Sequence, residues 1–126
     1  MPRVTSYRVP TTDLQGENSY VVFRRLGWKT AREVNKYLVI GNVQTRSDLT
    51  VDEIEKRIAE EERLTSECVL NGILEWNWQD EAGTPIPIPT KMEDLDALTA
   101  DEVTFLIMHA TGASRQQELK EAEAKN

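Results

Sequence analysis

Two stretches near the start of the chain have the composition of β-strands. Residues 3–9 and 19–26 are rich in β-branched and aromatic side chains, which fit the pleated surface of a strand. The nine residues between them include Pro10, Gly16 and Asn18, residue types that are typical of turns. The pattern predicts an antiparallel hairpin with a long connecting loop.

The next segments follow a helical period. Thr30–Glu33 has the spacing of a capping box, so a short helix is expected to begin there and to end before Gly41. A second capping box, Thr50–Glu53, opens the longest helical segment, whose last third is apolar on nearly every side. Gly72 weakens helix formation in that segment by about 1 kcal/mol relative to Ala. One helix over 50–74 and two helices that break near 62–66 both fit the sequence.

The segment that follows is marked by tryptophan and proline. Three prolines within residues 85–89 exclude a helix and a central strand, because each proline lacks a backbone donor. In an extended chain, Trp76 and Trp78 share one face, and so do Ile86 and Ile88. A turn at residues 80–83 is expected to bring the two pairs together in a small hydrophobic clasp.

Two more capping boxes precede the C-terminal segment. Thr90–Glu93 predicts a helix of one or two turns, and Thr99–Glu102 predicts a final helix that carries an apolar stripe. Gly112 is a suitable residue to end it. Residues 114–126 hold one large apolar side chain, so we expect a polar, flexible tail there.

These elements predict an α+β fold that is mostly helical, with an N-terminal β-hairpin followed by three to five helices. The alternative is an all-α protein in which the first stretches are too short to form a sheet. A chain of 126 residues is long enough for one domain. We therefore expect a single globular domain over residues 1–113 and the tail over 114–126.

Charge is unevenly distributed along the chain. The formal net charge is −7, yet residues 1–47 sum to +5 and the remainder to −12. Either the two parts attract each other within one fold, or the first part binds an acidic partner. An acidic remainder would repel a phosphate backbone, so nucleic acid is not an expected partner.

The sequence also indicates where the protein resides. No apolar run approaches the roughly 20 residues that span a bilayer, and the N-terminus resembles no secretory signal. The single cysteine cannot form an internal disulfide. We expect a cytoplasmic protein that does not contact membranes.

Groups suited to catalysis are scarce. His109 is the only histidine and lies within an apolar helical segment, and Cys68 lies beside Val69 and an acidic residue, which disfavours a reactive thiolate. The acids near the C-terminal helices occur in first turns, where the helix dipole favours them. No nucleotide-binding loop or metal-binding spacing is present. We expect no enzymatic activity, no cofactor and no metal site.

Two stretches of the chain resemble a known family. The passage from Val69 to Ile107 combines an apolar helix, Trp76-Asn77-Trp78, an acidic turn with Gly83, alternating prolines and two capped helices. Together with residues 20–28 and the helix that follows, it resembles the tail assembly chaperones of long-tailed (siphovirus-type) bacteriophages and prophages. The two stretches cover about half of the chain.

The resemblance implies a function in virion assembly. Such chaperones bind the long helical tape measure protein and keep it soluble while tail tube subunits polymerise around it. In many phages a ribosomal frameshift adds a domain that is thought to recruit tail tube protein. The resemblance thus implies the tape measure protein as partner, with tail tube protein and self-association as further contacts, in the host cytoplasm and not in the mature virion. The alternative is a structural minor tail or connector component of the virion.

The last predicted helix is the expected contact surface, because an apolar stripe on it exceeds what a thin core needs. Methionine suits an adaptable surface, and tryptophan is enriched in interface hot spots, although it is equally a core residue. The candidate partner-binding residues are Val103, Phe105, Leu106, Met108, Trp76 and Trp78.

Overall fold

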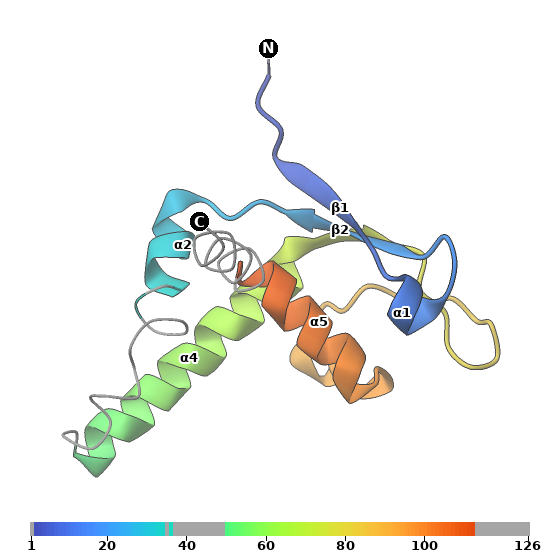
Figure 1. The fold of residues 1–126 in the computed structure, drawn as a ribbon. Helices are drawn as coiled ribbons and strands as arrows, with labels where there is room; N and C mark the ends of the chain where they lie inside the picture. The colour runs from blue at the N-terminus through green and yellow to red at the C-terminus, as the bar shows by residue number, and fades with distance from the viewer. Residues whose placement is uncertain (1, 35, 37–49, 113–126) are drawn as a thin grey trace, which may run out of the picture.

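The computed structural model describes residues 2–34, 36 and 50–112 (Figure 1). Three strands and several helices follow one another, in an α+β arrangement that begins with a β-hairpin, as the sequence predicts. In chain order the elements are β1 (Ser6–Pro10), α1 (Thr12–Gln15), β2 (Tyr20–Arg24), α2 (Trp28–Val34), α4 (Val51–Gly72), β3 (Ile73–Trp76), the 3-10 helix η3 (Met92–Ala97) and α5 (Ala100–Ala110).

The strands form an antiparallel sheet in the order β1-β2-β3. Tyr7 pairs with Phe23, and Val9 pairs with Val21. These four side chains belong to the core or pack against it, because residues two apart on a strand lie on the same face. The predicted hairpin is therefore confirmed, with one addition: its connector holds the short helix α1.

The connector is held in place by side-chain hydrogen bonds. Thr11 donates its hydroxyl to Ser19 Oγ at 2.7 Å, and both residues are buried. Gln15 donates to the Glu102 carboxylate at 2.5 Å and accepts from the Gln79 backbone N–H at 2.9 Å. The loop between β1 and β2 is thus attached to α5 and to the tryptophan segment.

Of the two interpretations of the longest segment, the continuous helix is correct. α4 begins where the Thr50 hydroxyl accepts from the Glu53 backbone N–H at 3.2 Å. It ends at Gly72, two residues before the predicted end, because Ile73 takes an extended conformation and pairs with Phe23 of β2. Strand pairing overrides local helical spacing here. A register irregularity at Val22 and Phe23 accompanies this pairing.

Two of the predicted capping boxes are wrong in detail. α2 begins at Trp28, and the Ala31 backbone N–H already donates to the Gly27 carbonyl, so Thr30 lies inside the helix. In η3 the capping carboxylate belongs to Asp94 and not to Glu93. The expected end of the first helix, at Gly41, and the tail over 114–126 lie outside the described residues.

The predicted clasp between the tryptophans and the proline segment is present at Ile86. Trp76 and Trp78 stack with ring centroids 4.6 Å apart, and Trp76 donates its indole N–H to the Ile86 carbonyl at 2.7 Å. The Ile86 backbone N–H donates to the Trp78 carbonyl at 2.9 Å. The turn is closed by a hydrogen bond from the Gly83 N–H to the Asp80 carbonyl, and Gly83 adopts a positive φ of 82°.

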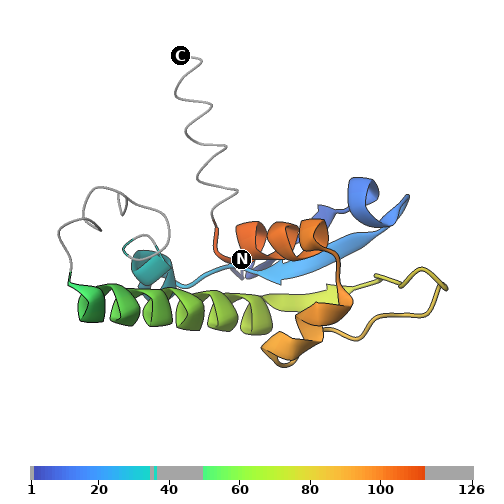
Figure 2. The same cartoon turned by 90° about the horizontal axis from the view of Figure 1, so that it is seen from below.

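α5 lies against the sheet, whereas the first half of α4 projects beyond it (Figures 1 and 2). A Cβ placed on Gly72 would lie 3.6 Å from Ala110 Cβ, so α4 and α5 approach closely at that point. The largest fully buried side chains are Trp78, Phe23, Leu64 and Leu106. The core therefore lies between the sheet, α5 and the second half of α4.

Candidate functional site

α5 carries four of the predicted partner-binding residues, and its position is fixed at both ends. At the start, the Thr99 hydroxyl accepts from the Glu102 N–H at 3.2 Å while the Glu102 carboxylate accepts from the Thr99 N–H at 2.9 Å. This is the predicted reciprocal capping box. At the other end, Gly112 follows the helix with a φ of 79°, the left-handed conformation expected of a residue that ends a helix.

An aromatic cluster joins α5 to the sheet. The Phe23 ring lies 5.6 Å from Tyr7, 6.0 Å from Phe105 and 5.5 Å from His109, measured between ring centroids. Phe105 and His109 are only 4.4 Å apart. Tyr7 donates its hydroxyl to the His109 carbonyl at 2.9 Å, so β1 is bonded directly to the last turn of α5.

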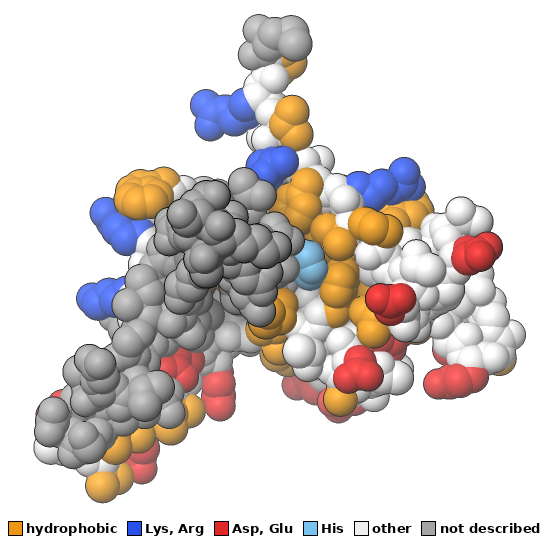
Figure 3. Space-filling model, viewed as in Figure 1, with side chains coloured by type: hydrophobic (Ala, Val, Ile, Leu, Met, Phe, Trp, Pro, Cys, Tyr) orange, Lys and Arg blue, Asp and Glu red, His pale blue; other side chains and the backbone are white. Residues whose placement is uncertain are grey.

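Apolar side chains reach the surface where α5 meets β1. Figure 3 shows hydrophobic side chains gathered beside the histidine on this face. Tyr7, Val9, Leu14 and Phe105 are half-buried and pack against the core from its edge. We call these four residues and His109, together with the adjacent half-buried Met108 of α5, the β1–α5 seam.

The structure divides the six predicted partner-binding residues into two groups. Leu106 and Trp78 are buried and belong to the core, so they support the surface from below and are not available to a partner. Val103, Phe105, Met108 and Trp76 are half-buried. Phe105 and Met108 lie in the seam, whereas Trp76 belongs to the clasp with Ile86.

Sequence reasoning did not assign the contribution of β1 and α1 to this surface. Tyr7 and Val9 alternate along a strand, which indicates a shared face, but nothing in that pattern shows that α5 covers the face only in part. The sequence predicts Leu14 as a loop residue, because the four helical residues of α1 are too few to give a recognisable period.

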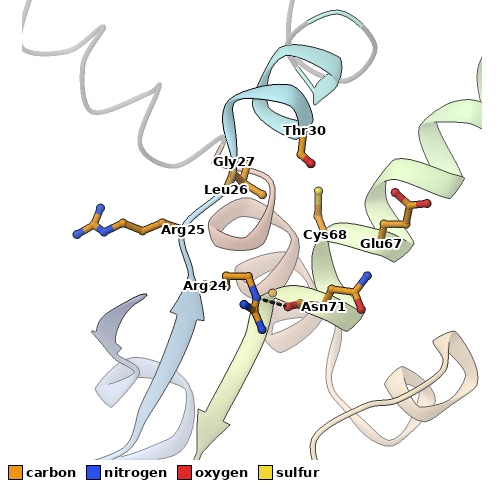
Figure 4. A pocket seen from close by; sticks show the side chains of 9 residues that line it. Arg24, Arg25, Leu26, Gly27, Thr30, Glu67, Cys68 and Asn71 are labelled. Atoms are coloured by element: carbon orange, nitrogen blue, oxygen red, sulfur yellow. Dashed lines mark hydrogen bonds between the residues drawn. The ribbon is translucent and has the colours of Figure 1, made fainter. Parts of the chain in front are cut away.

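A small cavity lies between α2 and α4 (Figure 4). Its volume is about 150 Å³, and the Cys68 side chain points across it toward Thr30, while Arg25 points away. Arg24 donates to the Asn71 carbonyl at 3.2 Å along one side. Burial, reinforced by the charges of Glu67 and Glu33, raises the pKa of the Cys68 thiol to about 11. The thiol is therefore protonated at neutral pH, which agrees with the sequence interpretation of Cys68 as an unreactive residue.

We expect Cys68 to react with a thiol reagent at pH 8 about a hundredfold more slowly than an exposed cysteine, because the pKa of about 11 lowers the thiolate fraction. Labelling with and without urea measures this difference.

The free energy of unfolding has a matching pH dependence, because a thiol whose pKa is higher in the folded than in the unfolded chain stabilises the fold at low pH. That contribution is lost as the pH rises from about 9 to about 11. Cys68→Ala is the control, and equal labelling rates with and without urea would contradict the assignment.

Some of the acidic residues near α5 have structural roles. Asp94 accepts hydrogen bonds from the Thr90 and Lys91 backbone N–H groups, and the first of these lowers the pKa of its carboxyl most. Glu102 caps α5 and accepts from Gln15.

Among residues 2–34, 36 and 50–112, no group of three or more His, Cys, Asp and Glu side chains is arranged to hold a metal ion. In the same part of the chain, none of the helices combines the length and apolarity that crossing a membrane requires.

Comparisons with protein-family models, with curated protein sequences and with solved structures find no match to this chain.

Proposed function

We propose that this protein is a tail assembly chaperone of a long-tailed bacteriophage or prophage, which binds the tape measure protein and keeps it soluble during tail tube assembly. The observation that carries the proposal is the β1–α5 seam, where Phe105 packs against the edge of the core and the half-buried Met108 follows three residues later on α5. The sequence resemblance supplies the identity of the partner. In this proposal, the protein is a binding module without catalytic activity. It works in the bacterial cytoplasm and is absent from the finished virion.

The seam suits the apolar side of a helix. Met108 follows the exposed residues Asp101 and Thr104 by seven and four positions, so it lies at the outer edge of α5. A methionine there adapts to different neighbouring side chains, while the aromatic residues behind it are fixed by the cluster around Phe23. A long helical partner would engage many copies of this weak site, and avidity would supply the total affinity.

Co-expression tests the proposal. The tape measure protein encoded near this chain is produced alone, with the wild-type chain, and with Met108→Ser. We expect it to be mostly insoluble alone, soluble with the wild type, and markedly less soluble with Met108→Ser. Thr104→Ser, which removes one methyl group from the exposed residue one turn before Met108, is the control and is expected to behave like the wild type. A tape measure protein that is equally soluble alone would refute the proposal.

Mass spectrometry of purified particles separates this proposal from a structural virion component. The chaperone is expected in the lysate and absent from the particles. Recovery of the chain from particles in a fixed ratio to tail tube protein would instead identify a minor tail or connector subunit.

A further inference from the structure

The outer edge of β1 has no partner strand among residues 2–34, 36 and 50–112. The sheet order is β1-β2-β3, so β1 pairs on one side only. The Arg25 N–H donates to the Thr5 carbonyl at 2.8 Å, and the Thr11 N–H donates to the Ser19 carbonyl at 3.0 Å. Bonded residues alternate along an antiparallel ladder, so the odd-numbered residues of β1 are those that bond to β2.

The even-numbered residues of β1 therefore direct their backbone groups away from the sheet. Ser6 and Arg8 each present an N–H and a carbonyl there, while Pro10 presents only a carbonyl. Figure 1 shows β1 along the margin of the sheet, with the N-terminal residues running away from it. A row of such backbone groups is a template for an added strand.

Basic and uncharged polar groups surround this edge. Residues 2–12 contain two bases and no acid. The Arg8 guanidinium lies 3.7 Å from the centroid of the Tyr20 ring, on the face of the sheet opposite α5. An open hollow of about 520 Å³ adjoins it, and none of the described residues that line it is acidic: Arg8, Pro10, Thr12, Asn18, Ser19 and Tyr20. The hollow therefore suits a carboxylate, which an arginine binds through charge-assisted hydrogen bonds.

The other face of the β1 edge is apolar. Tyr7 and Val9 are half-buried and pack against the core. In an added antiparallel strand, directly opposed residues share a face. Side chains opposite Arg8 would lie on the basic face, and side chains opposite Tyr7 and Val9 would lie on the apolar face. The edge thus selects a strand in which apolar and acidic side chains alternate.

A second copy of β1 does not meet this requirement. Antiparallel pairing of the full strand with itself places Arg8 directly opposite Arg8 of the other copy. Like charges in that position are destabilising. Pro10 would oppose Ser6, so a backbone hydrogen bond is lost at each end of the pair. The edge therefore disfavours pairing of the chain with itself.

We propose that the outer edge of β1 binds an extended segment of another protein, in which acidic residues alternate with apolar ones. The acidic residues exchange backbone hydrogen bonds with β1, and the one opposite Arg8 places its carboxylate on the guanidinium. The apolar residues between them lie beside Tyr7 and Val9. This inference goes beyond the proposed function, because it concerns backbone pairing with an extended segment. The co-expression test with the tape measure protein does not decide it.

Amide hydrogen exchange, followed residue by residue by NMR on the full chain, tests the pairing. The probe is a capped peptide in which valine and glutamate alternate. Without peptide, the Ser6 and Arg8 amides are expected to exchange fast, and the Tyr7 and Val9 amides slowly because they bond to β2. With peptide at about ten times its Kd, exchange at Ser6 and Arg8 should slow about tenfold.

N-methylated peptides separate strand pairing from other modes of binding. In the bound peptide, the glutamate N–H groups face β1 and the valine N–H groups face solvent. N-methylation of the glutamates should therefore abolish the protection of Ser6 and Arg8. N-methylation of the valines is the matched control and should leave the protection unchanged. The protein is the wild type in both experiments, so its fold does not differ between them.

Substitutions in β1 test the contribution of the chain itself. Ser6→Pro removes one outward N–H without removing a bond to β2, and it should weaken peptide binding about fivefold. Ser6→Ala keeps the N–H and is the control. Arg8→Glu should reverse the preference for the glutamate peptide over a peptide of alternating valine and lysine. Lys56→Glu, the same charge change at an exposed position on α4, should leave that preference unchanged.

Four results would overturn the inference. The first is unchanged exchange at Ser6 and Arg8 with saturating peptide. The second is an equal effect of the two N-methylated peptides, which would show binding without strand pairing. The third is a wild type that binds the lysine peptide as tightly as the glutamate peptide. The fourth is protection of Ser6 and Arg8 that rises with protein concentration in the absence of peptide, which would assign the edge to a second copy.

Discussion

Trp78→Ala is expected to lower the free energy of unfolding by about 3–5 kcal/mol. The Trp78 side chain is 1% exposed, stacks on Trp76, and lies 6.2 Å from Phe105 between ring centroids. It also donates its indole N–H to Thr11 Oγ1 at 3.1 Å, so its removal opens a cavity and leaves a buried hydroxyl short of a partner. Domains of this size are stable by about 5–15 kcal/mol. Urea unfolding followed by far-UV circular dichroism measures the loss.

Trp28→Ala is the matched control, because the same atoms are removed from a side chain that is 74% exposed. Its effect should stay within about 0.5 kcal/mol. Trp78→Phe retains an aromatic ring but loses the indole N–H, and we expect an intermediate loss. If the two alanine variants unfolded at the same urea concentration, the assignment of Trp78 to the core would be wrong.

Some elements of the fold can be predicted from the sequence and others cannot. The hairpin, the long helix and the clasp follow from strand-forming composition, helical periodicity and proline content, which are local properties. β3 was missed because Ile73 and Leu74 continue the apolar pattern of α4, and only pairing with β2 selects the extended conformation. The capping box predicted at Thr99 forms with both of its hydrogen bonds, and Thr50 caps α4 through the single bond from the Glu53 N–H.

The candidate surface was predictable in part. The helical period identified the apolar stripe of α5, on which Phe105 and Met108 are half-buried. The period did not reveal that Leu106 is fully buried while Phe105 is only half-buried, because both belong to the broad apolar stripe of this helix. The contribution of Tyr7 depends on contacts across more than a hundred residues of sequence, such as its hydrogen bond to the His109 carbonyl.

The second large expected effect on stability is at Phe23, whose aromatic cluster supports the β1–α5 seam. This side chain is fully buried at the centre of the aromatic cluster, with Tyr7, Phe105 and His109 around it. Phe23→Ala is expected to lower the free energy of unfolding by about 3–5 kcal/mol. Val22→Ala is the control, because the neighbouring side chain points to the other face of the sheet and is only half-buried. We expect it to cost less than about 1.5 kcal/mol.

Phe23→Leu separates the hydrophobic contribution of Phe23 from its ring contacts. Leucine fills much of the space, so the chain should remain folded with a loss of about 1–2 kcal/mol, while aromatic pairs contribute about 0.5–1.5 kcal/mol beyond their buried area. In the folded variant, the ring protons of His109 should shift in the NMR spectrum, because the Phe23 ring that stacks on them is gone. Unchanged His109 signals would show that α5 does not lie on β2 as described. Because the seam depends on the same cluster, Phe23→Leu should also weaken binding of the proposed helical partner although Phe23 itself is buried.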